Sequence, residues 1–332
     1  MRCLLLTEAG AAVGFGHATR CHALSYALNS FGYEADVWVR HVGSNPYPSM
    51  DLNFKDWWNI AETEKAALRS CDLIVVDTFL AEQGVLDELF SLNSRIAFID
   101  DYIHRDYPAG LVIDWTMAAE FHAYPVKCEG VRYLLGSRYC VLRPSFWQTE
   151  DIPVSRSLTS LMVTFGGCDI RSLTEMVVQH LHRAFPTVDI HAVLGPGFYH
   201  GYNGNPCQDE KIHFHSSLDA NAMKKLMYSC DLAICGGGQT LYELASCGLP
   251  PLVVELIDNQ NDDIQGFVGI GFAEFVGSWE EKKLMDNIVM AIRKLEDPCL
   301  RSDRARIGRQ AIDGRGAMRV AQELDIFRKI SP

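Results

Sequence analysis

The sequence lacks the features that would assign it to several broad classes of protein. No apolar run approaches the roughly 18–20 residues that a membrane span needs, so we expect no stable membrane insertion. Lysine and arginine number 30 against 42 acidic residues, and the net charge of −12 argues against a general binder of nucleic acid or of membrane surfaces. Glu8 interrupts the short apolar run at the amino terminus, which therefore indicates a first strand rather than a signal peptide.

The eleven cysteines include no Cys-x-x-Cys pair. Cys230, Cys235 and Cys247 lie near one another in the sequence, but their spacing fits no common zinc arrangement. They are better interpreted as small buried apolar residues in a reducing compartment. We therefore expect a cytoplasmic protein without a metal site.

The length of 332 residues predicts two domains, at roughly 100–200 residues each. Apolar residues make up 48% of the chain and charged residues 22%, which is typical of a globular enzyme. Short apolar runs, small-residue loops and amphipathic stretches alternate along both halves, which predicts an α/β fold of two Rossmann-like domains. Polar residues and Pro153 interrupt this pattern within 148–157, so we expect domains at 1–152 and 153–332.

Two glycines and a histidine follow the first apolar run. Gly14, Gly16 and His17 lie between a predicted strand at 3–6 and a predicted helix at 21–28, at the sheet edge where ligands bind. An imidazole at the start of a helix can take a proton from water or a hydroxyl near neutral pH, although it can also simply cap the helix. The motif is not the dinucleotide fingerprint, because the third glycine is missing.

Carboxylates close three predicted strands of the first half. Asp77 ends the apolar run from residue 71, Asp100 and Asp101 end the next run, and Asp114 ends a further short one. Because parallel strands end at the same edge of a sheet, these side chains can supply general bases or accept hydrogen bonds from sugar hydroxyls. Any single one of them more commonly caps the next helix or turn, so both roles stay open.

The second half contains two further glycine loops. Phe165-Gly166-Gly167 follows a predicted strand at 161–164, and the three consecutive glycines 236–238 precede a helix that should begin near Gln239. Backbone N–H groups and a helix dipole at such a loop can bind a diphosphate without lysine. The alternative is a tight turn that allows close helix packing.

Three polar side chains near this second loop can bind a nucleotide. Glu243 lies about one turn into the predicted helix, where its carboxylate can accept both hydroxyls of a ribose. Asn259 and Gln260 follow a later strand to the same edge. Their amides can hydrogen-bond a phosphate or a sugar without adding charge.

Six ordered stretches resemble the family of nucleotide-sugar hydrolases of the pseudaminic-acid pathway along nearly the whole chain. They are VGFGHATRC, VVDTF, IDD, LLGSRYCVLRPSFW, VTFGGCDIRSLT and CGGGQTLYELASCGLPPLVVELIDNQ. These hydrolases act on UDP-2,4-diacetamido-2,4,6-trideoxy-β-L-altropyranose and are akin to glycosyltransferases of two facing Rossmann-like domains. The resemblance implies a glycosyltransferase-B-type fold with a cleft between the domains and UDP bound mainly by the second. It also implies attack of water on the anomeric carbon with inversion and C–O cleavage, with no metal and no cofactor.

The resemblance further implies roles for individual residues. His17 would be the general base or water-orienting group, Glu243 would bind the ribose, and Asn259 and Gln260 would lie near the pyrophosphate and the sugar. The candidate substrate-binding residues are Gly14, Gly16, Arg20, Asp77, Phe79, Phe165, Gly166, Gly167, Gly237, Gly238, Gln239, Thr240, Glu243, Asn259 and Gln260.

Three positions depart from the family pattern. Phe79 stands where the family often has tyrosine, Thr7-Glu8 where a basic residue is common, and Ser145 where an acid is usual. These departures lie on the sugar side, so they bear on the identity of the sugar and of the acceptor more than on the nucleotide.

Two other functions fit the same motifs. An inverting glycosyltransferase would use the same UDP-sugar donor with a hydroxyl acceptor in place of water. Trp57-Trp58 would then be a candidate apolar patch for a lipid acceptor, although paired tryptophans are more often core residues. A non-catalytic nucleotide-sugar-binding protein would keep the glycine loops without turnover. The sequence leaves the oligomeric state open.

Overall fold

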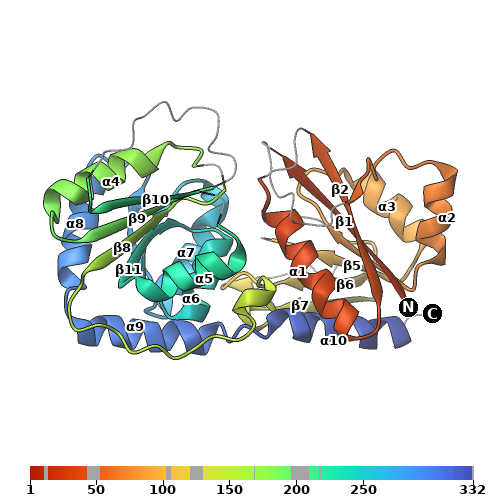
Figure 1. The fold of residues 1–332 in the computed structure, drawn as a ribbon. Coiled ribbons are helices and arrows are strands. Elements are labelled where there is room, and N and C mark those ends of the chain that lie inside the picture. Colours follow the sequence, from red (N-terminus) through yellow and green to blue (C-terminus); the bar gives the residue numbers. More distant parts are fainter. Residues whose placement is uncertain are drawn as a thin grey trace. The chain divides into compact units, whose positions relative to one another are not determined.

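The chain divides into two compact units in the computed structural model (Figure 1). Unit 1 comprises Met1–Pro144 and Arg315–Pro332, and unit 2 comprises Ser145–Gly314. The structure describes residues 1–10, 14–42, 53–101, 106–119, 130–167, 169–195, 209–216 and 218–330.

Unit 1 is built on a parallel sheet of seven strands, counted over the described residues, in the order β3-β2-β1-β4-β5-β6-β7. The strands are β1 (Arg2–Gly10), β2 (Glu34–Val42), β3 (Asn53–Phe54), β4 (Leu73–Asp77), β5 (Ile96–Ile99), β6 (Gly110–Asp114) and β7 (Val131–Leu135). Every residue of β4, β5 and β6 is buried. Near-continuous apolar runs belong to parallel strands covered on both faces, which is why the sequence pattern predicted them.

Helices cover both faces of this sheet. They are α1 (Gly16–Ser30), α2 (Glu62–Ser70), α3 (Gln83–Leu92) and α10 (Gly316–Ile330). Alternate strand residues such as Leu6 and Val76 pack with Leu86 of α3, while α1 packs against β1, β2 and α10. Trp57 lies in the same core as Leu6 and is 0% exposed, so this tryptophan is a core residue and not a surface patch.

The C-terminal helix α10 packs in unit 1, whereas the sequence pattern placed all of 153–332 in the second domain. A Cβ atom at Gly316 would lie 2.0 Å from the carbonyl oxygen of Cys140, so the start of α10 lies directly on that segment. Tyr33 donates a hydrogen bond to Asp325 at 3.0 Å. These contacts join residues that are far apart in the chain, and a local sequence pattern does not reveal them. The chain first passes from unit 1 to unit 2 after Pro144, whereas the sequence pattern placed this boundary at residue 152.

Unit 2 repeats the winding of unit 1. Its parallel sheet of six strands, again counted over the described residues, has the order β10-β9-β8-β11-β12-β13. The strands are β8 (Ser160–Thr164), β9 (Asp189–Leu194), β10 (Ile212–Ser216), β11 (Leu232–Gly236), β12 (Pro251–Glu255) and β13 (Glu274–Ser278). The helices are α4 (Leu173–Ala184), α5 (Ala220–Ser229), α6 (Gln239–Cys247), α7 (Asn261–Gly269), α8 (Leu284–Lys294) and α9 (Pro298–Ala311). The prediction of two Rossmann-like domains is confirmed.

The last two helices are separated at a glycine. α9 ends at Ala311 and α10 begins at Gly316, just after Gly314 and Arg315. Among the helices that the structure describes, none has the length and apolar character needed to cross a membrane.

Candidate active site

The loop between β1 and α1 places His17 in the first turn of α1. Gly10 and Gly14 exchange backbone hydrogen bonds of 3.1 and 2.7 Å; residues 11–13 between them lie outside the described part. Gly14 has a φ of +72°, in the left-handed region that favours glycine. At Gly16, no atom lies within 4 Å of the position that a Cβ would take. The strand, glycine turn and helix predicted here are all present.

His17 contacts a buried carboxylate at the end of β4. Its Nδ1 lies 2.7 Å from Oδ1 of Asp77, and the two side chains are 16% and 1% exposed. Because an ionised carboxylate can only accept a hydrogen bond, Nδ1 carries the proton that lies between the two atoms. Nε2 is then the acceptor nitrogen of the neutral ring, and the described residues provide no partner for it.

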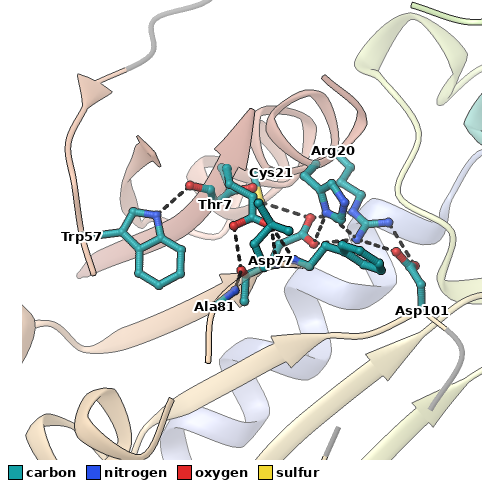
Figure 2. Close-up of polar contacts among 12 residues, drawn as sticks. Thr7, Arg20, Cys21, Trp57, Asp77, Ala81 and Asp101 are labelled. Atoms are coloured by element: carbon teal, nitrogen blue, oxygen red, sulfur yellow. Dashed lines mark hydrogen bonds and ion pairs between the residues drawn. The ribbon is translucent and has the colours of Figure 1, made fainter. Parts of the chain in front are cut away.

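Arg20 binds Asp77 and a second carboxylate, Asp101. Its Nε donates to Asp77 Oδ2 at 2.5 Å and its Nη2 to Asp77 Oδ1 at 2.6 Å. Nη1 and Nη2 also donate to Asp101, at 3.0 and 2.9 Å, as Figure 2 shows. The guanidinium lies 4.9 Å from the ring centre of Trp115. Because its donors face carboxylates, Arg20 positions the Asp77 side chain.

The electrostatics of this group follow from burial and from these pairs. Burial disfavours the ionised form of Asp77, but the charge of Arg20 and the hydrogen bonds from Arg20 and His17 outweigh it and hold the pKa of Asp77 well below its usual range. Burial likewise disfavours the charge of Arg20, but Asp101 and Asp77 raise its pKa well above the ordinary value. Asp77 and Arg20 are therefore both charged at neutral pH.

Glu8 is a buried residue of the site whose role the sequence did not reveal. Its Oε1 accepts the backbone N–H groups of Phe79 and Leu80 at 2.6 and 2.7 Å, and its Oε2 accepts the hydroxyl of Thr78 at 2.9 Å. This carboxylate therefore fixes the loop that follows Asp77. Phe79 is held 44% exposed at this loop, at the position where the resemblance places a sugar contact.

In unit 2, the glycines before α6 differ in their surroundings. A Cβ at Gly237 would lie 2.6 Å from Cγ1 of Ile264, so close packing requires a glycine there. At Gly238 the nearest atom would be Nε2 of Gln260, 3.9 Å away. Gly238 is the N-cap of α6 and is half-buried, with room for a Cβ. The packing interpretation therefore explains Gly237, while a ligand-binding role for Gly238 stays a prediction.

The side chain of Gln260 connects two loops at this edge. Its Oε1 accepts the N–H groups of Gly237 at 3.2 Å and of Leu256 at 3.1 Å. The N–H of Gly237 is thus already bonded and does not face a ligand. Gln260 fixes the glycine turn, whereas Asn259 is exposed in the short helix η5 (Asp258–Gln260).

The remaining predicted residues of unit 2 lie at the ends of β8 and in α6. Phe165 is buried in the core, and Gly166, with a φ of +79°, is exposed. Half-buried residues are Gly167 in the same loop and Gln239 and Thr240 at the start of α6. Glu243 is 4% exposed.

Arg171 is a cation at the same edge that the sequence did not identify as a ligand. Its Nε donates to the carbonyl of Leu256 at 3.1 Å, and its Cζ lies 4.0 Å from the ring centre of Trp279. Within the described ranges, its two terminal nitrogens have no hydrogen-bond partner. Its place in the VTFGGCDIRSLT stretch is the only signal in the sequence that could have pointed to it.

In the described part of the chain, the side chains that could bind a metal do not form a cluster. No set of three or more histidine, cysteine, aspartate or glutamate residues there could hold a metal ion. Of the eight described cysteines, seven are buried and Cys299 is exposed. Burial raises the pKa of Cys230 and of Cys247 to about 12, so these thiols stay protonated. Their interpretation as buried apolar residues is confirmed.

Comparison with known proteins supports the resemblance. No protein-family model matches the chain. The chain is 25% identical over 273 residues to a Helicobacter pylori protein named pseudaminic acid cytidylyltransferase and UDP-2,4-diacetamido-2,4,6-trideoxy-beta-L-altropyranose hydrolase, covering 78% of this chain and 45% of that protein. It is 27% identical over 198 residues to the spore coat polysaccharide biosynthesis protein SpsG of Bacillus subtilis, covering 58% of each. The chain spans about half the length of the curated relatives it matches.

Solved structures share the fold. MurG of Acinetobacter baumannii has a TM-score of 0.61 at 15% identity, over 99% of this chain and 100% of that chain. The UDP-GlcNAc 2-epimerase of Neisseria meningitidis bound to UDP-GlcNAc has a TM-score of 0.62 at 11% identity, over 98% and 100%. At these identities the likeness concerns the fold alone. The two Rossmann-like units therefore form a glycosyltransferase-B-type fold, and the resemblance to the pseudaminic-acid hydrolases is confirmed.

Proposed function

We propose that the chain is a UDP-sugar hydrolase of pseudaminic or a related nonulosonic acid synthesis. It releases UDP and a free 2,4-diacetamido-2,4,6-trideoxyhexose. The observation that carries the proposal is the pair of His17 and Asp77, with Nδ1 of the ring bound to a buried carboxylate and Nε2 free of described partners. The hydrolase name of the Helicobacter pylori relative supports the same reaction.

In the proposed reaction His17 acts as the general base. Its Nε2 takes a proton from water while the water oxygen bonds to the anomeric carbon and the bond from that carbon to the diphosphate oxygen breaks. The bonding electron pair leaves with UDP, and the configuration at the anomeric carbon is inverted. Asp77 keeps the ring in the Nδ1–H tautomer and stabilises the imidazolium that forms. A positioned base of this kind accelerates a reaction by typically about 10²–10⁴-fold.

The proposal assigns the nucleotide to unit 2. The diphosphate binds at the N-terminus of α6, where Gly238 leaves space and the helix dipole favours negative charge. Gly166 and Asn259 are exposed at the same edge, and Glu243 binds the ribose. Stabilisation of the departing diphosphate by such fixed dipoles is a large contribution to catalysis in many enzymes.

A second candidate is an inverting glycosyltransferase. The observation that favours it is the exposure of Phe79 and Leu80, each 44%, on the loop that follows Asp77. Such a pair offers apolar surface to an acceptor. Trp57 does not, because it is 0% exposed.

The deciding experiment incubates the protein with a panel of UDP-sugars without an acceptor and measures free UDP and free sugar. We expect release by the wild type, and loss of release in His17→Ala with UDP binding retained in calorimetry. UDP release only after addition of an acceptor would instead identify a transferase. Binding without release under either condition would identify a non-catalytic nucleotide-sugar-binding protein.

A further inference from the structure

We propose that Asp101, acting through Arg20, sets the proton affinity of His17 and with it the pH range in which the base works. Asp101 is in this view a positioning residue and not a catalytic one, because its side chain contacts Arg20 and no other side chain in the described part of the protein. The inference rests on the proposed function where it is tested by the pH dependence of UDP release. Its test by NMR titration of the His17 ring does not depend on that function.

The argument begins with the Nη2 nitrogen of Arg20. It lies 2.6 Å from Oδ1 of Asp77, 2.9 Å from Oδ2 of Asp101 and 3.1 Å from Nδ1 of His17. A guanidinium nitrogen of this type carries two hydrogens, and the two carboxylate oxygens accept them. The positively charged Nη2 therefore lies beside the Nδ1–H group of His17 without accepting a hydrogen bond from it. Its positive charge opposes protonation of the ring.

The charges around His17 act in opposite directions. The negative charge of Asp77 favours the protonated ring, and the positive charge of Arg20 opposes it. Asp101 is the second negative charge, and it compensates the positive charge of Arg20. The attraction between Asp77 and the protonated His17 ring is then less opposed. Since Nη2 bridges the two groups, the Asp101 carboxylate lies no more than about 6 Å from the ring nitrogen, within the range at which a charge shifts a titration.

Within the part of the chain that the structure describes, the other ionisable groups near the cluster do not supply this compensation. The Cys21 thiol lies 3.6 Å from Asp77 Oδ2, and burial raises its pKa well above the ordinary value, so it is neutral. The Glu8 carboxylate is bonded to the loop of Thr78 and Leu80. Asp100 and Asp114 are buried at the ends of the neighbouring strands, and both keep their carboxyl groups in the Asp101 variants.

The geometry allows the charge of Asp101 to be removed while one of its two contacts with Arg20 is kept. An asparagine at this position has nearly the same shape, and its Oδ1 can still accept a hydrogen bond from Arg20. Asp101 is also the more exposed of the two carboxylates, at 24% of its side chain against 1% for Asp77, so the substitution disturbs the buried site less than the same change at Asp77 would.

The test follows the His17 ring by NMR over a pH titration and, separately, the pH dependence of kcat/KM for UDP release. In Asp101→Asn we expect the His17 titration midpoint and the acid limb of the rate profile to move together to lower pH, by about 0.5–1 unit. That shift equals roughly a 3- to 10-fold loss of proton affinity. Asp101→Glu keeps the charge and should keep the midpoint.

Asp87→Asn is the matched control, because it removes the same charge from an exposed position of α3 bonded to Gln83. A midpoint unchanged in Asp101→Asn, or shifted equally in Asp87→Asn, would overturn the inference. A loss of activity at every pH with an unmoved midpoint would reduce Asp101 to a structural role and overturn it as well. A shifted midpoint in a protein that releases no UDP would support the inference while refuting the proposed function.

Discussion

Substitution of Asp77 by asparagine tests the central contact of the site. The carboxylate accepts from His17 Nδ1 at 2.7 Å with Oδ1 and from Arg20 with both oxygens. An amide can accept at only one of the two positions. If its NH₂ group faces His17, Nδ1 must become the acceptor and Nε2 carries the proton, so the ring is no longer a base toward water. If the NH₂ group faces Arg20, two donors oppose each other in a buried site.

The size of the effect follows from burial and charge. Asp77 is 1% exposed, and its loss leaves the buried Arg20 with Asp101 as its one charged partner among the described residues. Removal of one member of a buried ion pair typically costs about 3–5 kcal/mol of unfolding free energy. Loss of the correct tautomer removes the contribution of the base, so kcat should fall by about 10²–10⁴-fold.

The assay compares Asp77→Asn with the control Asp87→Asn in urea unfolding and in UDP release. Because the folded-state pKa of Asp77 lies well below its usual value of 3.8, its ionised form stabilises the fold above about pH 4, and this stability is lost as the pH falls further. The difference between wild type and Asp77→Asn should therefore be full at neutral pH and should shrink in acid. Activity within twofold of wild type, or equal unfolding free energies at pH 7, would refute the reasoning.

Three further substitutions test other parts of the site. In Glu8→Gln the loop amides lose a charged acceptor, so KM for the sugar substrate should rise several-fold while UDP affinity in calorimetry stays unchanged; an effect on UDP alone would contradict this. Gly237→Ala should lower the unfolding free energy by about 1–3 kcal/mol because its Cβ would lie 2.6 Å from a neighbouring side chain, whereas Gly238→Ala should keep its stability and weaken UDP binding. Arg171→Gln should weaken UDP binding about 5- to 10-fold and make it less sensitive to salt, as the loss of a charge-assisted contact predicts; unchanged binding at low salt would exclude Arg171 from the site.

The sequence by itself determined the local elements. Apolar runs closed by an acid gave β4, and a glycine turn before an amphipathic stretch gave the start of α1, because burial on both faces and backbone freedom at glycine are properties of neighbouring residues. They also placed Asp77 and Gly238 at sheet edges. Two Rossmann-like domains follow from the same alternation repeated in both halves, whereas the glycosyltransferase-B type was implied by the family resemblance.

Only the tertiary structure decided what these residues contact. Asp77 could have capped its own turn, but it binds His17 and Arg20, which precede it by about sixty residues in the chain. Gln260 was expected to lie near the pyrophosphate and the sugar, and the structure shows in addition that its Oε1 bonds the glycine turn. The physical reason is that periodicity records which face of an element is buried, whereas a hydrogen bond between distant segments depends on distances that only the folded chain sets.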